Sequence, residues 1–323
     1  MDSSWLENGY KILTSPLVPI KGSWLDALAV LAIFMALYLP VILFLKLKRY
    51  RIARTFNQLI SAVVFVLFYH ICFCAIRNGI YGISLIGTDD LSAFILLIPG
   101  VLILVFSMSV GRIFCGWVCP LGCLQDFTAW ISKPLRKRKI FLMILAWLIM
   151  FWYVIDLYLN RPQAQFISEL APALFVFYML VVLNIYILVP AAAGFLGKLR
   201  YALLVFWVFL ILIDVYVVSP WCVMQGGEFY YSWLGSLLAV LAAAMLVPRF
   251  WCRFICPMGA LLGIFNKVSA IKLEKNPIPS DSESECRANC LMGAIEDNGR
   301  KERKCIYCGR CIEKDYYRKE FRV

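Results

Sequence analysis

The stretch Gly111-Arg-Ile-Phe-Cys-Gly-Trp-Val-Cys-Pro-Leu-Gly-Cys123 decides how this chain is organised, because the chain contains it twice. The pattern returns 137 residues later as Val247-Pro-Arg-Phe-Trp-Cys-Arg-Phe-Ile-Cys-Pro-Met-Gly-Ala260. Each copy follows a strongly apolar segment and carries an arginine, a Cys-x3-Cys-Pro pair and a glycine at matching positions. Thiols four residues apart lie on one side of a helix and can hold a soft metal centre. The repeat therefore predicts a metal site with four ligands: Cys115, Cys119, Cys252 and Cys256.

The composition indicates a membrane protein. The 323 residues are 62% apolar and only 16% charged, and apolar runs of about 20 residues fit helices that cross a bilayer. The formal net charge of +12 does not indicate nucleic-acid binding, because the basic residues cluster in short connections between apolar runs, as the positive-inside rule expects. We therefore predict an all-α polytopic membrane protein with an internal repeat of transmembrane helix hairpins and no cleavable signal peptide.

Composition shifts divide the chain into four parts. They are an interfacial segment (1–22), a membrane domain of about seven helices (23–270), a polar linker (271–285) and a small module (286–323). Basic runs, such as the one within residues 46–54, indicate loops on the inner side. We expect a multi-pass protein of the cytoplasmic (inner) membrane, with its N-terminus outside and its C-terminal module in the cytoplasm.

The C-terminal module contains the most specific motif, Cys305-x2-Cys308-x2-Cys311. This spacing is typical of a loop around one [4Fe–4S] cluster whose fourth ligand is a distant cysteine, and Cys290 is the candidate. A module of fewer than 40 residues cannot bury enough core to fold unaided, so a metal staple is expected. A four-cysteine zinc site is the alternative. The module lacks the cysteines for a second complete ferredoxin cluster, which leaves Cys286 over.

A second cluster is expected from the four repeat cysteines, with Cys286 or Cys123 as substitutes. Inert buried thiols, or a site for copper or another soft metal, are the alternatives. The basic residues Arg112, Arg249 and Arg253 would offset the charge of such a cluster and tune its potential.

Further candidates lie inside or beside the apolar runs. Asp156 and Asp214 could accept protons from a quinol, although near a helix end an aspartate can simply reach water. His70 is the only histidine, and it could bond a quinone carbonyl or serve a helix end. Near the outer face, Cys72, Cys74 and Cys222 could form a disulfide or a metal relay, or could pack as small apolar residues.

Paired Cys-x3-Cys-Pro segments followed by a ferredoxin-like tail resemble the polyferredoxin-type 4Fe-4S membrane proteins, such as NapH, the membrane part of NosR and CcoG. The resemblance is specific at residues 111–124, 249–261 and 286–311. It implies electron transfer between a quinone pool or a cytoplasmic donor and a partner redox protein across the membrane, within a hetero-oligomeric complex. A copper-handling assembly factor for a membrane oxidase and a zinc-stapled scaffold are the alternatives.

Overall fold

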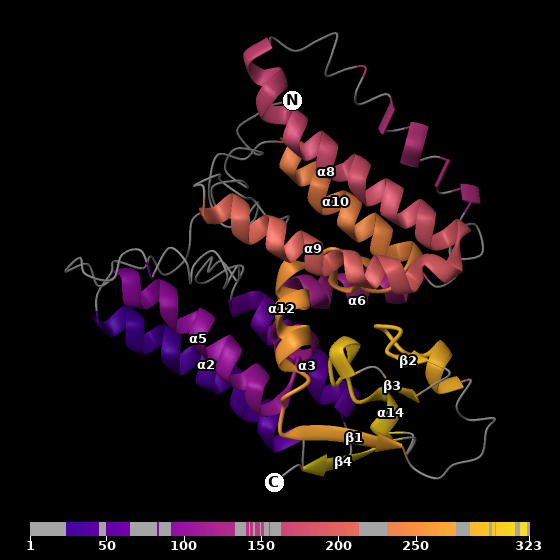
Figure 1. The fold of residues 1–323 in the computed structure, drawn as a ribbon. Helices are drawn as coiled ribbons and strands as arrows, with labels where there is room; N and C mark the ends of the chain where they lie inside the picture. The colour runs from indigo at the N-terminus through magenta and orange to yellow at the C-terminus, as the bar shows by residue number, and fades with distance from the viewer. Residues whose placement is uncertain are drawn as a thin grey trace.

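The computed structural model describes residues 24–44, 50–64, 83, 92–132, 163–212, 231–275, 285–296, 299–300, 302–313 and 317–321, with 140–141, 143–144, 146–148, 150–151 and 155. This part of the chain is mostly helical, as predicted (Figure 1). One pair of long helices and one group of three lie on either side of the shorter helices that carry the cysteines.

The two sequence repeats fold alike, each as a long apolar helix, a short cysteine-bearing turn and a second helix. The first copy comprises α5 (Ser92–Val110), the π-helical turn η2 (Phe114–Val118) and α6 (Pro120–Ile131). The second comprises α10 (Tyr231–Leu246), α11 (Phe250–Phe254) and α12 (Pro257–Phe265). The shared architecture explains why the sequence pattern recurs.

The second cysteine of each pair caps the helix that follows it. Cys119 and Cys256 have nearly the same backbone conformation, with φ of −62° and −56° and ψ of 115° in both. The proline after each cysteine has no N–H group to continue the preceding turn, and its restricted φ suits the first position of a helix. The Cys-Pro dipeptide therefore ends one helix and starts the next.

The remaining long helices surround the repeats. They are α2 (Trp24–Phe44), α8 (Gln163–Leu188) and α9 (Ala193–Leu212), with a 3-10 turn η4 (Pro190–Ala192) between the last two. Helix α2 packs along α5, α10 packs against α8 and α6, and α12 packs against α9 (Figure 1).

Helix α3 (Tyr50–Val63) corrects the prediction of a basic inner loop that continued to Arg54. Its polar side is buried, with Arg54, Asn57, Gln58 and Ser61 each at most 5% exposed, while apolar residues such as Ile52 and Phe56 face outward. The prediction was wrong because the loop that it placed within residues 46–54 overlaps this helix, in which Arg54 has buried partners in the first repeat.

The C-terminal part contains two short antiparallel sheets. Strand β1 (Ile271–Lys275) pairs with β4 (Tyr317–Phe321), with Ile271 opposite Phe321. Strand β2 (Ile295–Glu296) pairs with β3 (Gly299–Arg300). The short helix η6 (Glu302–Lys304) precedes Cys305, and α14 (Arg310–Glu313) contains Cys311. The predicted linker 271–285 was therefore wrong for residues 271–275, because these pair with the last strand of the module.

Within the described ranges, no helix combines the length and the apolarity that a bilayer-crossing helix needs. The predicted interfacial segment 1–22 lies outside the described residues.

The cysteine loop of the tail packs directly on the first repeat. The Nε1 atom of Trp117 donates to the carbonyl oxygen of Tyr307 at 2.9 Å, and Nδ2 of Asn266 donates to that of Cys305 at 3.2 Å. A Cβ atom placed on Gly116 would lie 2.1 Å from the carbonyl oxygen of Ile306. Only glycine allows this close approach, so the tail and the repeat form one packed unit.

We predict that Gly116→Ala destabilises the protein by about 1–3 kcal/mol, because the added methyl group meets backbone that cannot swing away. Thermal unfolding of the purified protein would measure the change. Gly194→Ala is the matched control, since a Cβ there has nothing within 4 Å. Equal melting temperatures for the two variants would contradict the tight contact.

Candidate iron–sulfur site

The four repeat cysteines lie close together where the two copies meet. Cys115 and Cys252 are in the turns and are buried, and Cys119 and Cys256 are at the helix caps. Burial raises the pKa of the Cys119 thiol, and the neighbouring Cys252 and Cys115 raise it further. Burial and the same two cysteines also raise the pKa of Cys256. The structure thus brings the predicted quartet together, and its binding of a cluster stays a prediction.

Polar hydrogens point at the sulfur atoms of the second copy. The backbone N–H of Gly259 donates to Cys256 Sγ at 3.3 Å, and Nε2 of Gln125 reaches across from the first copy to Cys252 Sγ at 3.3 Å. Hydrogen bonds to a ligand sulfur orient it and stabilise its thiolate form. These donors suit thiolates that bind a metal centre.

The carbonyl groups at the end of the first cysteine turn are bonded by side chains from elsewhere. A helix that ends at an extended residue followed by proline leaves its last carbonyls without backbone partners. The donors are Arg249 to Cys115 (2.5 Å), Arg54 and Gln58 to Gly116 (both 2.8 Å), Asn57 to Trp117 (3.0 Å) and Ser61 to Val118. Helix α3 therefore holds the turn between Cys115 and Cys119 in place.

Asp126 joins α3 to the second repeat through two arginines. Arg249 donates from Nε and Nη2 to the two carboxylate oxygens, both at 2.7 Å, and Arg54 also pairs with this carboxylate. Burial alone would raise the pKa of Asp126, but Arg249 and Arg54 lower it to about 2 from the ordinary 3.8. The carboxylate therefore stabilises the fold fully above pH 3.8, and this contribution is lost as the pH falls through about 2.

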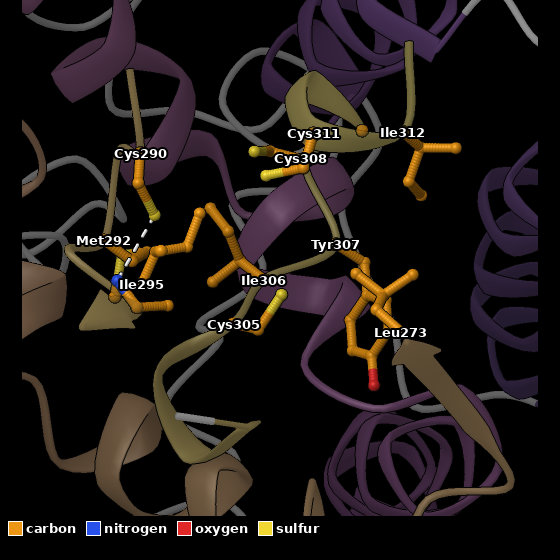
Figure 2. A pocket seen from close by; sticks show the side chains of 12 residues that line it. Leu273, Cys290, Met292, Ile295, Cys305, Ile306, Tyr307, Cys308, Cys311 and Ile312 are labelled. Atoms are coloured by element: carbon orange, nitrogen blue, oxygen red, sulfur yellow. Dashed lines mark hydrogen bonds between the residues drawn. The ribbon is translucent and has the colours of Figure 1, made fainter. Parts of the chain in front are cut away.

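The four tail cysteines surround an apolar cavity (Figure 2). Figure 2 shows Cys290 at the upper left, Cys308 and Cys311 at the top and Cys305 below them, with Met292, Ile295 and Ile306 also in the lining. The backbone N–H of Ala294 donates to Cys290 Sγ at 3.2 Å. In the described part of the chain, no three Cys, His, Asp or Glu side chains converge on a point that would hold a single ion. Four thiols spaced around one cavity fit a [4Fe–4S] cluster, which takes a thiolate at each iron.

Two other cysteines lie outside these quartets. Cys123 is half-buried on α6, where burial and then the carboxylate of Asp126 raise the pKa of its thiol. Cys286 is buried but does not line the tail cavity. None of the ten described cysteines forms a disulfide. The candidates His70, Cys72, Cys74, Asp156, Asp214 and Cys222 lie outside the described residues.

The repeats match a known domain family. Residues 92–139 and 229–276 each match the family described as a 4Fe-4S binding domain. Each match contains one Cys-x3-Cys-Pro pair together with the apolar helix before it. The chain therefore carries this domain twice, and both matches fall on the repeats.

Several characterised proteins resemble the chain. Protein NirI of Paracoccus denitrificans is 28% identical over 62% of this chain and 24% of its own length. The ferredoxin-type protein NapH of Haemophilus influenzae is 22% identical over 68% of this chain and 65% of its own length. The methylamine utilization ferredoxin-type protein MauN of Methylorubrum extorquens is 27% identical over 58% of this chain and 50% of its own length.

The chain thus spans between about a quarter and two thirds of the length of these relatives. No solved structure matches it. The predicted resemblance to the polyferredoxin-type 4Fe-4S proteins is confirmed by the two domain matches and by these relatives.

The residues that support the cysteines were not predicted from the sequence. Arg54, Asn57, Gln58 and Ser61 recur at helical spacing and form a polar stripe in an apolar region, a pattern that could have indicated a buried polar face. Asp126 is the only acid on α6, yet its arginine partners lie 72 and 123 residues away in the chain. Only the fold brings them together.

We predict that Asp126→Asn destabilises the protein by about 3–5 kcal/mol, because it leaves two buried guanidinium groups without their shared carboxylate. Denaturant titration at neutral pH would measure the loss. Glu313→Gln removes an ion pair with Arg51, whose side chain is 64% exposed, and should cost no more than about 1 kcal/mol. A similar small loss in both variants would show that the buried network contributes little.

Proposed function

We propose that this chain is a membrane-bound iron–sulfur subunit that passes electrons between a quinone pool or a cytoplasmic donor and a partner redox protein. Cys115, Cys119, Cys252 and Cys256 would hold one [4Fe–4S] cluster, and Cys290, Cys305, Cys308 and Cys311 would hold a second. Such clusters, when bound, accept and release one electron at a time.

The observation that carries the proposal is the packing of the tail's cysteine loop on the segments that carry the repeat cysteines. Asn266, at the end of the second repeat, donates to the carbonyl of Cys305 and accepts from the backbone N–H of Arg112 at 3.2 Å. Trp117, between two repeat cysteines, donates to the residue before Cys308. Electron transfer slows steeply with distance, so two cysteine-bearing segments that are hydrogen-bonded to one another suit a relay.

Apolar side chains on the outer faces of the helices support the membrane part of the proposal. Val205 on α9 is 70% exposed, and Ile52 on α3 is 74% exposed, although the buried side of α3 is polar. A helix with its polar side inward and its apolar side outward suits an apolar surrounding rather than water. The mean hydropathy of +0.79 agrees with this interpretation.

The first test is the metal content of the anaerobically purified chain. We expect about eight irons and eight acid-labile sulfides per chain, and about four of each in Cys256→Ser and in Cys305→Ser, because each substitution removes one cluster ligand. Cys123→Ser is the matched control and should keep about eight. Stoichiometric copper would instead favour the assembly-factor alternative, and zinc without an EPR signal after dithionite would favour the scaffold.

The second test concerns the membrane and the electron donor. After cell fractionation, we expect the chain to stay with membranes washed in high salt, and a water-soluble quinol added anaerobically to bleach the visible absorbance of the clusters. Release by the wash would remove the membrane assignment. If the chain stays with the membranes but the quinol does not bleach the cluster absorbance, the proposal of an electron relay stands and this quinol is excluded as its donor.

A further inference from the structure

The arginines at matching positions of the two repeats have different surroundings. Arg249 is paired with Asp126, but the residue that matches Asp126 in the second copy is Gly263. Arg112 is 0% exposed, and its Nη1 atom donates to the carbonyl oxygen of Arg303 at 2.9 Å. Its Nε and Nη2 atoms have no hydrogen-bond partner, and no carboxylate of the described residues pairs with it.

Arg112 lies against the cysteine turn of the second repeat. A Cβ atom on Gly259 would be 2.9 Å from Nη2 of Arg112 and 3.1 Å from the carbonyl oxygen of Cys252. The backbone N–H of Gly259 in turn donates to Cys256 Sγ. The unpartnered side of the guanidinium is therefore beside both cysteines of this copy.

A second buried arginine strengthens the positive charge at this position. Arg200 on α9 is 2% exposed, and its Nη2 atom lies 3.5 Å from the same carbonyl oxygen of Arg303. Its Nε atom also lacks a partner, and its polar contact with another side chain is to the hydroxyl of Tyr201 at 2.9 Å. Two guanidinium groups thus share one carbonyl without a described acid to balance them.

Burying unbalanced charge is costly unless an opposite charge lies nearby. In the first repeat Asp126 supplies one negative charge to both Arg249 and Arg54, so one of these two guanidinium charges is balanced, whereas Arg112 and Arg200 have no described acid. In the second repeat the thiolates of the quartet would supply that charge once they bind metal. Burial raises the pKa of the Cys252 thiol to about 11, and Arg249 and, to a smaller extent, Arg112 act against this rise. The geometry therefore gives different surroundings to the three basic residues that were expected to offset the cluster charge, Arg112, Arg249 and Arg253. Arg253 instead lies over the rings of Tyr186 and Phe254, at 5.3 and 5.2 Å.

We propose that the positive charge of Arg112, supported by that of Arg200, raises the reduction potential of the repeat centre. Arg249, which is paired with Asp126, serves mainly to join the two copies. This inference rests on the proposed function, because it requires a cluster on the repeat cysteines. Reduction adds negative charge, which an unbalanced guanidinium stabilises.

The test is a redox titration followed by EPR on the purified full chain. We expect Arg112→Gln to lower the midpoint potential of one cluster. Arg112→Lys keeps the positive charge and should have a potential close to that of the wild type. Asp126→Asn should raise the potential, because it removes the negative charge that balances Arg249. Arg51→Gln is the control, since Arg51 is largely exposed and paired with Glu313, and both potentials should stay unchanged. If Arg112→Gln does not fold, Arg200→Gln should lower the same potential.

The outcomes separate this inference from the proposed function. Wild-type chain with about four irons would overturn the repeat centre and the inference with it. About eight irons with potentials that move in neither Arg112→Gln nor Arg200→Gln would overturn the inference alone. If chloride or phosphate in the buffer removes the difference in midpoint potential between the wild type and Arg112→Gln, the arginines serve a bound anion. That result would also overturn the inference.

Discussion

The guanidinium of Arg249 crosses from the second repeat to the first, where it donates to the carboxylate of Asp126 at 2.7 Å and to the carbonyl of Cys115 at 2.5 Å. Asp126 also receives Arg54 from α3, so three segments distant in the chain meet at one carboxylate. Because the network is buried, its charges interact strongly, and none can be removed without leaving another unpaired. The position of the first cysteine turn depends on this network.

Around this network the two repeats are alike in backbone but not in environment. Both end a turn at a Cys-Pro dipeptide and start a helix there. Only the first copy is covered by α3, whose side chains bond the carbonyls of the turn. The second copy instead faces Arg112 and the carbonyl of Arg303 from the tail. A symmetric pair of motifs thus produces a centre with two different sides.

The C-terminal tail packs on the repeats and is part of the same folded unit. Strand β1 continues directly from the second repeat and pairs with the last strand of the chain, which fixes both ends of the module. Trp117, Asn266 and Gly116 then hold the loop of Cys305 against the first turn. A module too small to fold on its own core is stabilised by packing against the helices. The same packing keeps its cysteine cavity next to the repeat quartet.

The sequence by itself determined the elements whose signals are local. The Cys-x3-Cys-Pro repeat, the grouping of Cys290 with Cys305, Cys308 and Cys311, and the apolar helices before each cysteine turn follow from spacing, because ligand geometry and helix periodicity act over a few residues. Only the tertiary structure decided which polar groups support them. The partners of Asp126 lie 72 and 123 residues away, β1 pairs with the end of the chain, and Arg112 lacks the acid that Arg249 has. Charge pairing and strand pairing depend on distance in space, which no local pattern records.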